Sequence, residues 1–190
     1  MKSLETLAAL VPPPEKPEAI PMDYDWTTLE EVQKLSDSYK GFVAMYGAGI
    51  FGDHVNFFTP SPRTVFNIHI ATDSIRAVHM TLLLGGANIP DLVRADCFFP
   101  VSKMGLFVVA DSVDGHSVFY ARTGRVQREN VILYDSHREV EGVALQFDLS
   151  VVEFFASIYS GRLELPGFST LLRGRQFFKP LRTSWLHGTG

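Results

Sequence analysis

The chain contains a single cysteine and has no long apolar run. Cys97 is the one cysteine among 190 residues, so no disulfide can form within the chain. It lies in the apolar run ADCFFP, where a buried, unreactive thiol is expected rather than a nucleophile. No stretch approaches the roughly 20 apolar residues of a membrane-spanning helix. The N-terminal sequence MKSLETLAALVPPP does not match a secretory signal, so we expect a cytoplasmic protein.

The sequence also lacks the spacing of a phosphate-binding loop. Residues 46–60 read YGAGIFGDHVNFFTP, with three glycines between a predicted helix and a predicted strand. Phosphate-binding loops run the other way, from a strand through glycines into a helix, with a defined glycine spacing that does not occur here. We therefore expect Gly47 to end a helix with a positive φ rather than to contact a nucleotide.

Patterns typical of catalysis or metal binding are missing as well. No two of the six histidines stand three or four residues apart on a predicted helix, and no zinc-type or G-x-S-x-G spacing is present. Asp53, His54 and His116 could meet as a metal-dependent hydrolase or nuclease site, which remains an alternative. Asp53 follows a glycine turn and Asp114 belongs to a hairpin tip, so turn positions are favoured over catalysis. We expect no catalytic residue, metal or cofactor.

Charge is unevenly distributed along the chain. The net charge is −4, with nine acidic and four basic residues in 1–60, against one acidic and five basic residues in 161–190. An acidic surface favours a basic partner over a phosphate backbone. The tail LLRGRQFFKPLRTSW interleaves basic and aromatic residues, as segments that bind single-stranded nucleic acid do. We favour a last strand whose aromatic side chains pack on the sheet while its charges face water.

Proline and glycine positions divide the chain. Five of the 11 prolines lie in residues 12–21, so residues 1–21 are expected to form an extended lead-in. The domain is then expected to span 22–165, with a basic and aromatic extension at 166–190.

Capping patterns and apolar periodicity predict a mixture of helices and strands. Helices are expected within 25–35, within 36–49 with Asp37 as the N-cap, within 72–86, and within 150–161 with a capping box between Ser150 and Glu153. Strands are expected at 54–60, 67–71, 131–135 and 140–149 and on both sides of Asp114-Gly115, a pair typical of a type I′ hairpin turn. The fold class expected from this order is α+β, with a largely antiparallel or mixed sheet and helices packed on it.

Three segments resemble the SUKH superfamily, also called the SMI1/KNR4 family. They are LSDSYKGFVAMYGAGIFGDHVNFFTP, VADSVDGHSVFYARTG and FDLSVVEFFASIYSGRLE. In this order they are similar to the family's helix ending in Y-G-x-G with the strand after it, its central glycine-bearing hairpin and its aromatic C-terminal helix. The resemblance covers roughly residues 22–165.

The resemblance implies a protein-binding module rather than an enzyme. Bacterial members are typically immunity proteins that bind the toxin domains, often nucleases, of polymorphic toxin systems, whereas fungal relatives are regulatory scaffolds, which stays an alternative. The expected partner is therefore a basic protein toxin domain, which this chain neutralises by occlusion. We expect no contact with a membrane and no direct contact with nucleic acid. The oligomeric state is open. Our candidate partner-binding residues are acidic side chains of the N-terminal third: Asp23, Asp25, Glu30, Glu31 and Asp53.

Overall fold

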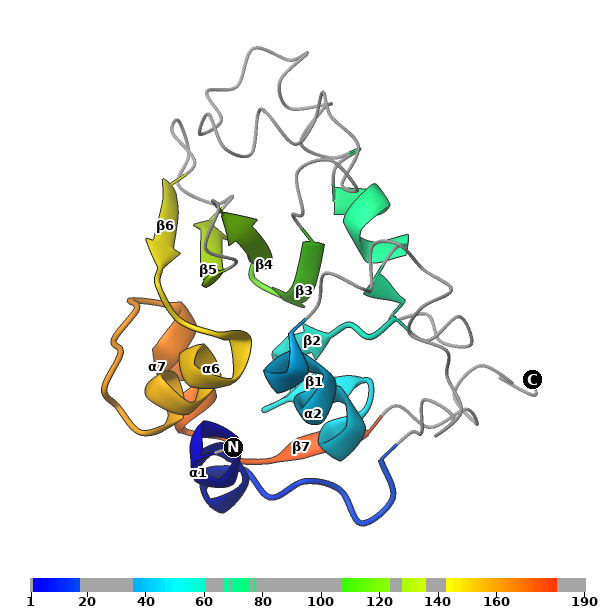
Figure 1. Cartoon of the computed structure of the whole chain (residues 1–190). Helices are drawn as coiled ribbons and strands as arrows, with labels where there is room; N and C mark the ends of the chain where they lie inside the picture. The colour runs from blue at the N-terminus through cyan, green and yellow to red at the C-terminus, as the bar shows by residue number, and fades with distance from the viewer. Residues whose placement is uncertain are drawn as a thin grey trace, which may run out of the picture.

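The chain forms an α+β fold with helices packed on an antiparallel sheet (Figure 1). The structure is a computed structural model that describes residues 2–17, 36–60, 67–68, 70–75, 77, 107–123, 128–135 and 143–180. The named helices are α1 (Lys2–Leu10), α2 (Asp37–Tyr46), α6 (Val151–Tyr159) and α7 (Phe168–Arg173). The strands are β1 (Gly49–Phe51), β2 (Val55–Phe57), β3 (Phe107–Ser112), β4 (His116–Thr123), β5 (Arg128–Asp135), β6 (Val143–Phe147) and β7 (Phe178–Pro180). The predicted fold class, with its largely antiparallel sheet, is confirmed.

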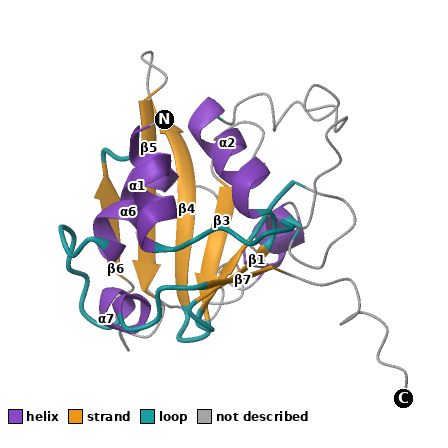
Figure 2. Cartoon of the chain, turned by 90° about the horizontal axis from the view of Figure 1, so that it is seen from below, coloured by secondary structure: helices purple, strands orange, loops and turns teal. Residues whose placement is uncertain are grey.

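The order of the strands explains why helices cover one face of the sheet. The described strands pair in the order β6-β5-β4-β3-β2-β1-β7, and each pair is antiparallel. The chain leaves β6 at one edge, passes through α6 and α7, and returns as β7 at the opposite edge. Together with α1 and α2, these helices lie on the same face of the sheet (Figure 2).

Helix α2 has the apolar face that its sequence predicts. Its buried residues are Tyr39, Phe42, Val43 and Tyr46. The N-cap is Ser36, one residue before the predicted Asp37, because its extended backbone lets the hydroxyl accept the Tyr39 N–H at 3.1 Å. Helix α6 likewise shows the predicted capping box between Ser150 and Glu153. Local signals therefore place the first turn of α6 as observed and that of α2 to within one residue.

Gly47 ends α2, as expected. Its backbone adopts φ 69° and ψ −164°, a combination almost restricted to glycine, and its N–H donates to the Val43 carbonyl at 2.8 Å. The chain then enters β1, so the glycines join a helix to a strand in the order opposite to that of a phosphate-binding loop.

The core of the sheet–helix interface is aromatic. The ring of Phe51 on β1 lies 5.9 Å from Phe42 of α2, 5.2 Å from Phe155 of α6 and 4.7 Å from Phe178 of β7, between ring centroids. The same side of the sheet carries Phe57, whose ring lies 4.5 Å from that of Phe42. One strand of three residues thus contacts two helices and an edge strand.

The predicted strand at 67–71 is wrong, because residues 68, 70–75 and 77 are helical. The alternation in NIHIA favours a strand, but Ile68 and Ala71 are buried at helical spacing while Ile70 is 59% exposed. The Asn67 side chain caps this helix by accepting the Ile70 N–H at 3.2 Å. The helix predicted within 72–86 thus begins earlier than expected. Its residues after position 77 lie outside the described part of the chain. The helix predicted within 25–35 also lies outside it.

The hairpin predicted at Asp114-Gly115 is present between β3 and β4. The turn is not of type I′, which requires a positive φ at both central residues. Gly115 has a φ of 79°, but Asp114 is not among the described residues with a positive φ. Gly115 N–H donates to the Ser112 carbonyl, which makes a three-residue loop with one left-handed residue.

Both ends of the described chain contribute to the core. Within the expected lead-in, Leu7 of α1 and Val11, the residue after this helix, lie in the core. The Val11 carbonyl accepts a hydrogen bond from the Tyr46 hydroxyl at 2.6 Å. Within the expected extension, Phe178 is buried and Lys179 is exposed, as the packed-strand interpretation of the tail predicts for these residues. Arg182 and Trp185 lie outside the described residues. The hydrophobic core therefore includes residues on both sides of 22–165.

Close approach of β7 to β1 requires a glycine at position 49. A Cβ atom there would lie 2.4 Å from both the Lys179 carbonyl oxygen and the Phe178 ring. We expect Gly49→Ala to lower the free energy of unfolding by about 1–3 kcal/mol, because the edge strand or its aromatic anchor must move. Urea denaturation measures the loss.

Gly174→Ala is the matched control for this prediction, since a Cβ at Gly174 meets nothing within 4 Å. It should leave the urea midpoint nearly unchanged. Equal midpoints for the two variants would show that β7 does not pack on Gly49.

Candidate protein-binding cleft

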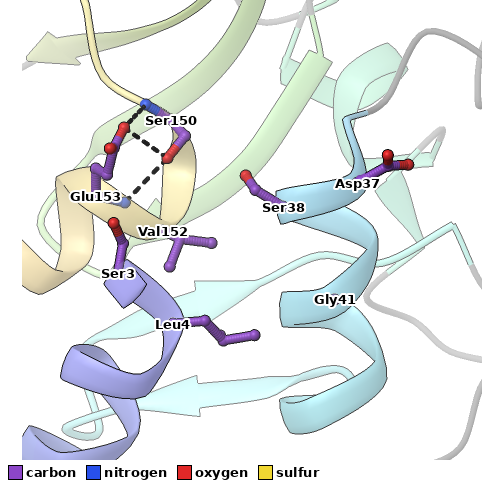
Figure 3. A pocket seen from close by; sticks show the side chains of 8 residues that line it. All are labelled: Ser3, Leu4, Asp37, Ser38, Gly41, Ser150, Val152 and Glu153. Carbon is purple, nitrogen blue, oxygen red and sulfur yellow. Dashed lines mark hydrogen bonds between the residues drawn. The ribbon is translucent and has the colours of Figure 1, made fainter. Parts of the chain in front are cut away.

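A cleft opens where the first turns of three helices meet (Figure 3). Its volume is about 360 Å³, within the range of small binding sites. The helices α1, α2 and α6 each contribute their N-terminal residues. The lining residues are Ser3, Leu4, Asp37, Ser38, Gly41, Ser150, Val152 and Glu153.

The floor of the cleft is apolar. Leu4 of α1 and Val152 of α6 direct their side chains toward the first turns of α2 (Figure 3). Opposite them, α2 presents Gly41, which has no side chain. A Cβ at this position would be 3.6 Å from the nearest Leu4 methyl carbon, an ordinary van der Waals contact. The packing of the helices therefore does not require a glycine at position 41.

Hydroxyl and carboxylate groups form the rim. The Glu153 carboxylate accepts hydrogen bonds from the Ser150 N–H and the Ser150 hydroxyl, both at 2.9 Å, and so is held at the start of α6. Asp37 is fully exposed, with the Lys40 ammonium 4.0 Å away. Each helix N-terminus carries about half a positive charge, which these two first-turn carboxylates offset. The cleft itself thus has little net charge, and an apolar or mildly polar side chain suits its floor.

The acidic residues expected to bind a partner are not brought together among the described residues. Asp23, Asp25, Glu30 and Glu31 lie outside the described part of the chain. Asp53 lies in the turn between β1 and β2, with φ 60°, and forms an ion pair with Lys179 of β7. Asp53 is not among the residues that line the cleft.

The two histidines proposed for hydrolysis have different surroundings. His116 is buried on β4, and its Nδ1 lies 3.1 Å from the hydroxyl of Ser112, which also accepts the His116 N–H. Both ring nitrogens of His54 are buried, and no described residue forms a hydrogen bond with them. Among the described residues no group of three or more His, Cys, Asp or Glu side chains could hold a metal ion. Cys97 lies outside these residues.

One carboxylate lies on the sheet face opposite α2. Asp111 of β3 is half-buried and accepts a hydrogen bond from the Asn56 side-chain amide at 2.8 Å. Burial raises the pKa of Asp111 above its usual value, and the hydrogen bond from Asn56 acts in the opposite direction.

Sequence reasoning missed the cleft because it missed α1. The signal was present: Leu4, Leu7 and Val11 follow each other at the spacing of one helix face. Because of the prolines from position 12 onward, the whole segment 1–21 was interpreted as extended. A proline at position 12 does not prevent a helix that ends before it. Gly41 and Val152 fell within predicted helices, but no role was assigned to them.

The buried state of Asp111 makes a prediction about pH. Asp111→Asn should raise the free energy of unfolding at neutral pH, because an amide avoids the cost of burying a charge and can still accept from Asn56. The gain should shrink as the pH falls through the raised pKa of Asp111, since the wild-type carboxyl then becomes neutral in the folded protein. Urea unfolding of both proteins across this pH range is the measurement.

Asp53→Asn is the control for this pH series. It removes an exposed ion pair and should lower the free energy of unfolding by at most about 1 kcal/mol. A loss of stability in Asp111→Asn at neutral pH would mean that the hydrogen bond from Asn56 outweighs the burial of the charge.

No described helix is both long and apolar enough to span a bilayer. Comparison with protein-family models, curated protein sequences and solved structures finds no match to this chain.

Proposed function

We propose that this chain is a protein-binding module of the SUKH kind, an immunity protein that binds a protein toxin domain and neutralises it by occlusion. Two features support the proposal. The three sequence segments resemble that superfamily in their order, and the helices on one face of the sheet leave a cleft for a partner. The observation that carries the proposal is the glycine in the floor of this cleft.

Glycine at position 41 lowers the stability of helix α2 relative to alanine. It stands in the middle of α2, where glycine is about 1 kcal/mol less favourable than alanine. A Cβ would fit there without a clash, so close packing among the described residues does not account for the glycine. A glycine instead keeps the floor open for a side chain that comes from outside the chain. This is the arrangement of an anchor pocket in a protein–protein interface.

The walls of the cleft are fixed before a partner arrives. Helices α2 and α6 are held to the sheet by Phe42 and Phe155, and the first turn of α6 is closed by its capping box. A preformed site loses little conformational entropy on binding, which favours affinity. A toxin loop inserted here would cover the toxin surface around it with the helical face of this domain.

The charge of the sequence before α2 favours a basic toxin. Asp37 and Glu153 at the rim are offset by the helix N-termini, so in this proposal the negative charge comes from the acidic segment that precedes α2 in the sequence. Opposite charges on two partners speed their encounter and disfavour wrong partners. Asp53 contributes less in this proposal, since Lys179 already pairs with it. The remaining proposed contacts are the acidic residues of that segment: Asp23, Asp25, Glu30 and Glu31.

The proposal is tested by co-expression with the neighbouring gene product. The reading frame immediately upstream is expected to encode a large secreted protein whose variable C-terminal domain is the toxin. Wild-type chain should restore growth of cells that express this toxin domain. Gly41→Met should bind the domain at least about tenfold more weakly, because its side chain fills the cleft, while its free energy of unfolding should not fall.

Ala44→Met, on the exposed side of the same helix, is the matched control and should restore growth as the wild type does. A toxin whose effect the wild type does not relieve would contradict the immunity function. Binding without relief of toxicity would favour the regulatory-scaffold alternative. Metal-dependent cleavage of nucleic acid by the purified chain would favour the hydrolase alternative.

A further inference from the structure

The two edges of the sheet differ in how they are protected. The β7 edge is three residues long, ends in Pro180 and carries Lys179 in an ion pair with Asp53. Short length, proline and lysine are the features with which edge strands resist pairing with another chain. Strand β6 has none of them: it is five residues long, pairs with β5 in regular register and reads VALQF.

Strand β6 also exposes apolar surface. Leu145, at its centre, is 43% exposed although its register partner is Leu133 of β5. Among the described strands, β5 is the one that pairs with β6, and no described strand pairs with the outer edge. Within the described part of the chain, the outer edge therefore has backbone groups without a strand partner beside a half-exposed leucine, a template for a further strand.

We propose that this edge pairs with the β6 strand of a second copy of the chain. In an antiparallel arrangement about a two-fold axis through Leu145, each Leu145 would face its counterpart and Val143 would face Phe147 of the other copy. Both of these pairs are apolar, whereas Ala144 would face Gln146 on the other face of the sheet. Cross-strand apolar pairs stabilise antiparallel sheets. The two sheets would join into one continuous sheet across the dimer.

Charge distinguishes a second copy from other occupants. Strand β6 contains no charged residue, so two copies can pair without placing like charges opposite each other. A basic toxin, the partner proposed for the cleft, would gain no electrostatic attraction from this uncharged edge. No residue of β6 lines the cleft, so filling the cleft with Gly41→Met should leave the dimer intact.

Sedimentation of the purified full chain tests the proposal. Wild type should sediment as a dimer at micromolar concentration and dissociate on dilution. Leu145→Lys and Leu145→Glu should each raise the dissociation constant at least about tenfold, because each places like charges opposite one another at the axis. An equal mixture of the two variants should sediment as a dimer again, since lysine then faces glutamate.

Val113→Lys is the matched control: Val113 is 64% exposed at the β3–β4 turn, and its replacement should leave the dimer intact. The restored dimer in the mixture also shows that the two Leu145 variants are folded. A wild type that stays monomeric at high concentration would overturn the proposal. So would a dimer that the two variants leave unchanged, or a mixture that stays monomeric.

Discussion

Phe51 packs its ring between two helices, and the arrangement of the other elements depends on this contact. Its plane is within 8° of that of Phe42 on α2 and within 14° of that of Phe155 on α6. Phe178 meets it from the edge strand in a T-shaped contact. Such aromatic pairs each contribute about 0.5–1.5 kcal/mol beyond their buried area. Three separate parts of the chain are thus fixed to one another through a single side chain.

The cleft follows from this arrangement. Because Phe51 and Phe57 set the positions of α2 and α6 on the sheet, the spacing between the two helices is decided by ring packing rather than by direct contact at their first turns. Helix α1 packs mainly against α6, with Leu7 in the core, and does not close the space beside Gly41. A stable aromatic interface therefore leaves an open site at one end of the helical layer.

The sequence predicted elements that depend on local interactions. Helix α2 was predictable because Tyr39, Phe42 and Tyr46 repeat at helical spacing, and α6 because Ser150 and Glu153 cap each other. Elements that depend on distant residues were not. Strand β1 is defined by pairing with β2 and with a strand more than a hundred positions later, and the helix after residue 67 is selected over a strand by its burial and its cap. The cleft needs three helices at once, so no local pattern could reveal it.

The central claim is that a protein partner occupies the cleft, and hydrogen exchange of the chain with and without the bound toxin domain tests it most directly. The account predicts slower exchange of backbone amides in the first turns of α1, α2 and α6, near Leu4, Gly41 and Val152, because an inserted side chain excludes water and restrains these turns. The exchange rates of the β3 amides around Asp111, whose side chain lies on the opposite face of the sheet, should be the same with and without the toxin domain. Protection on that opposite face, with the three first turns unchanged, would contradict the account.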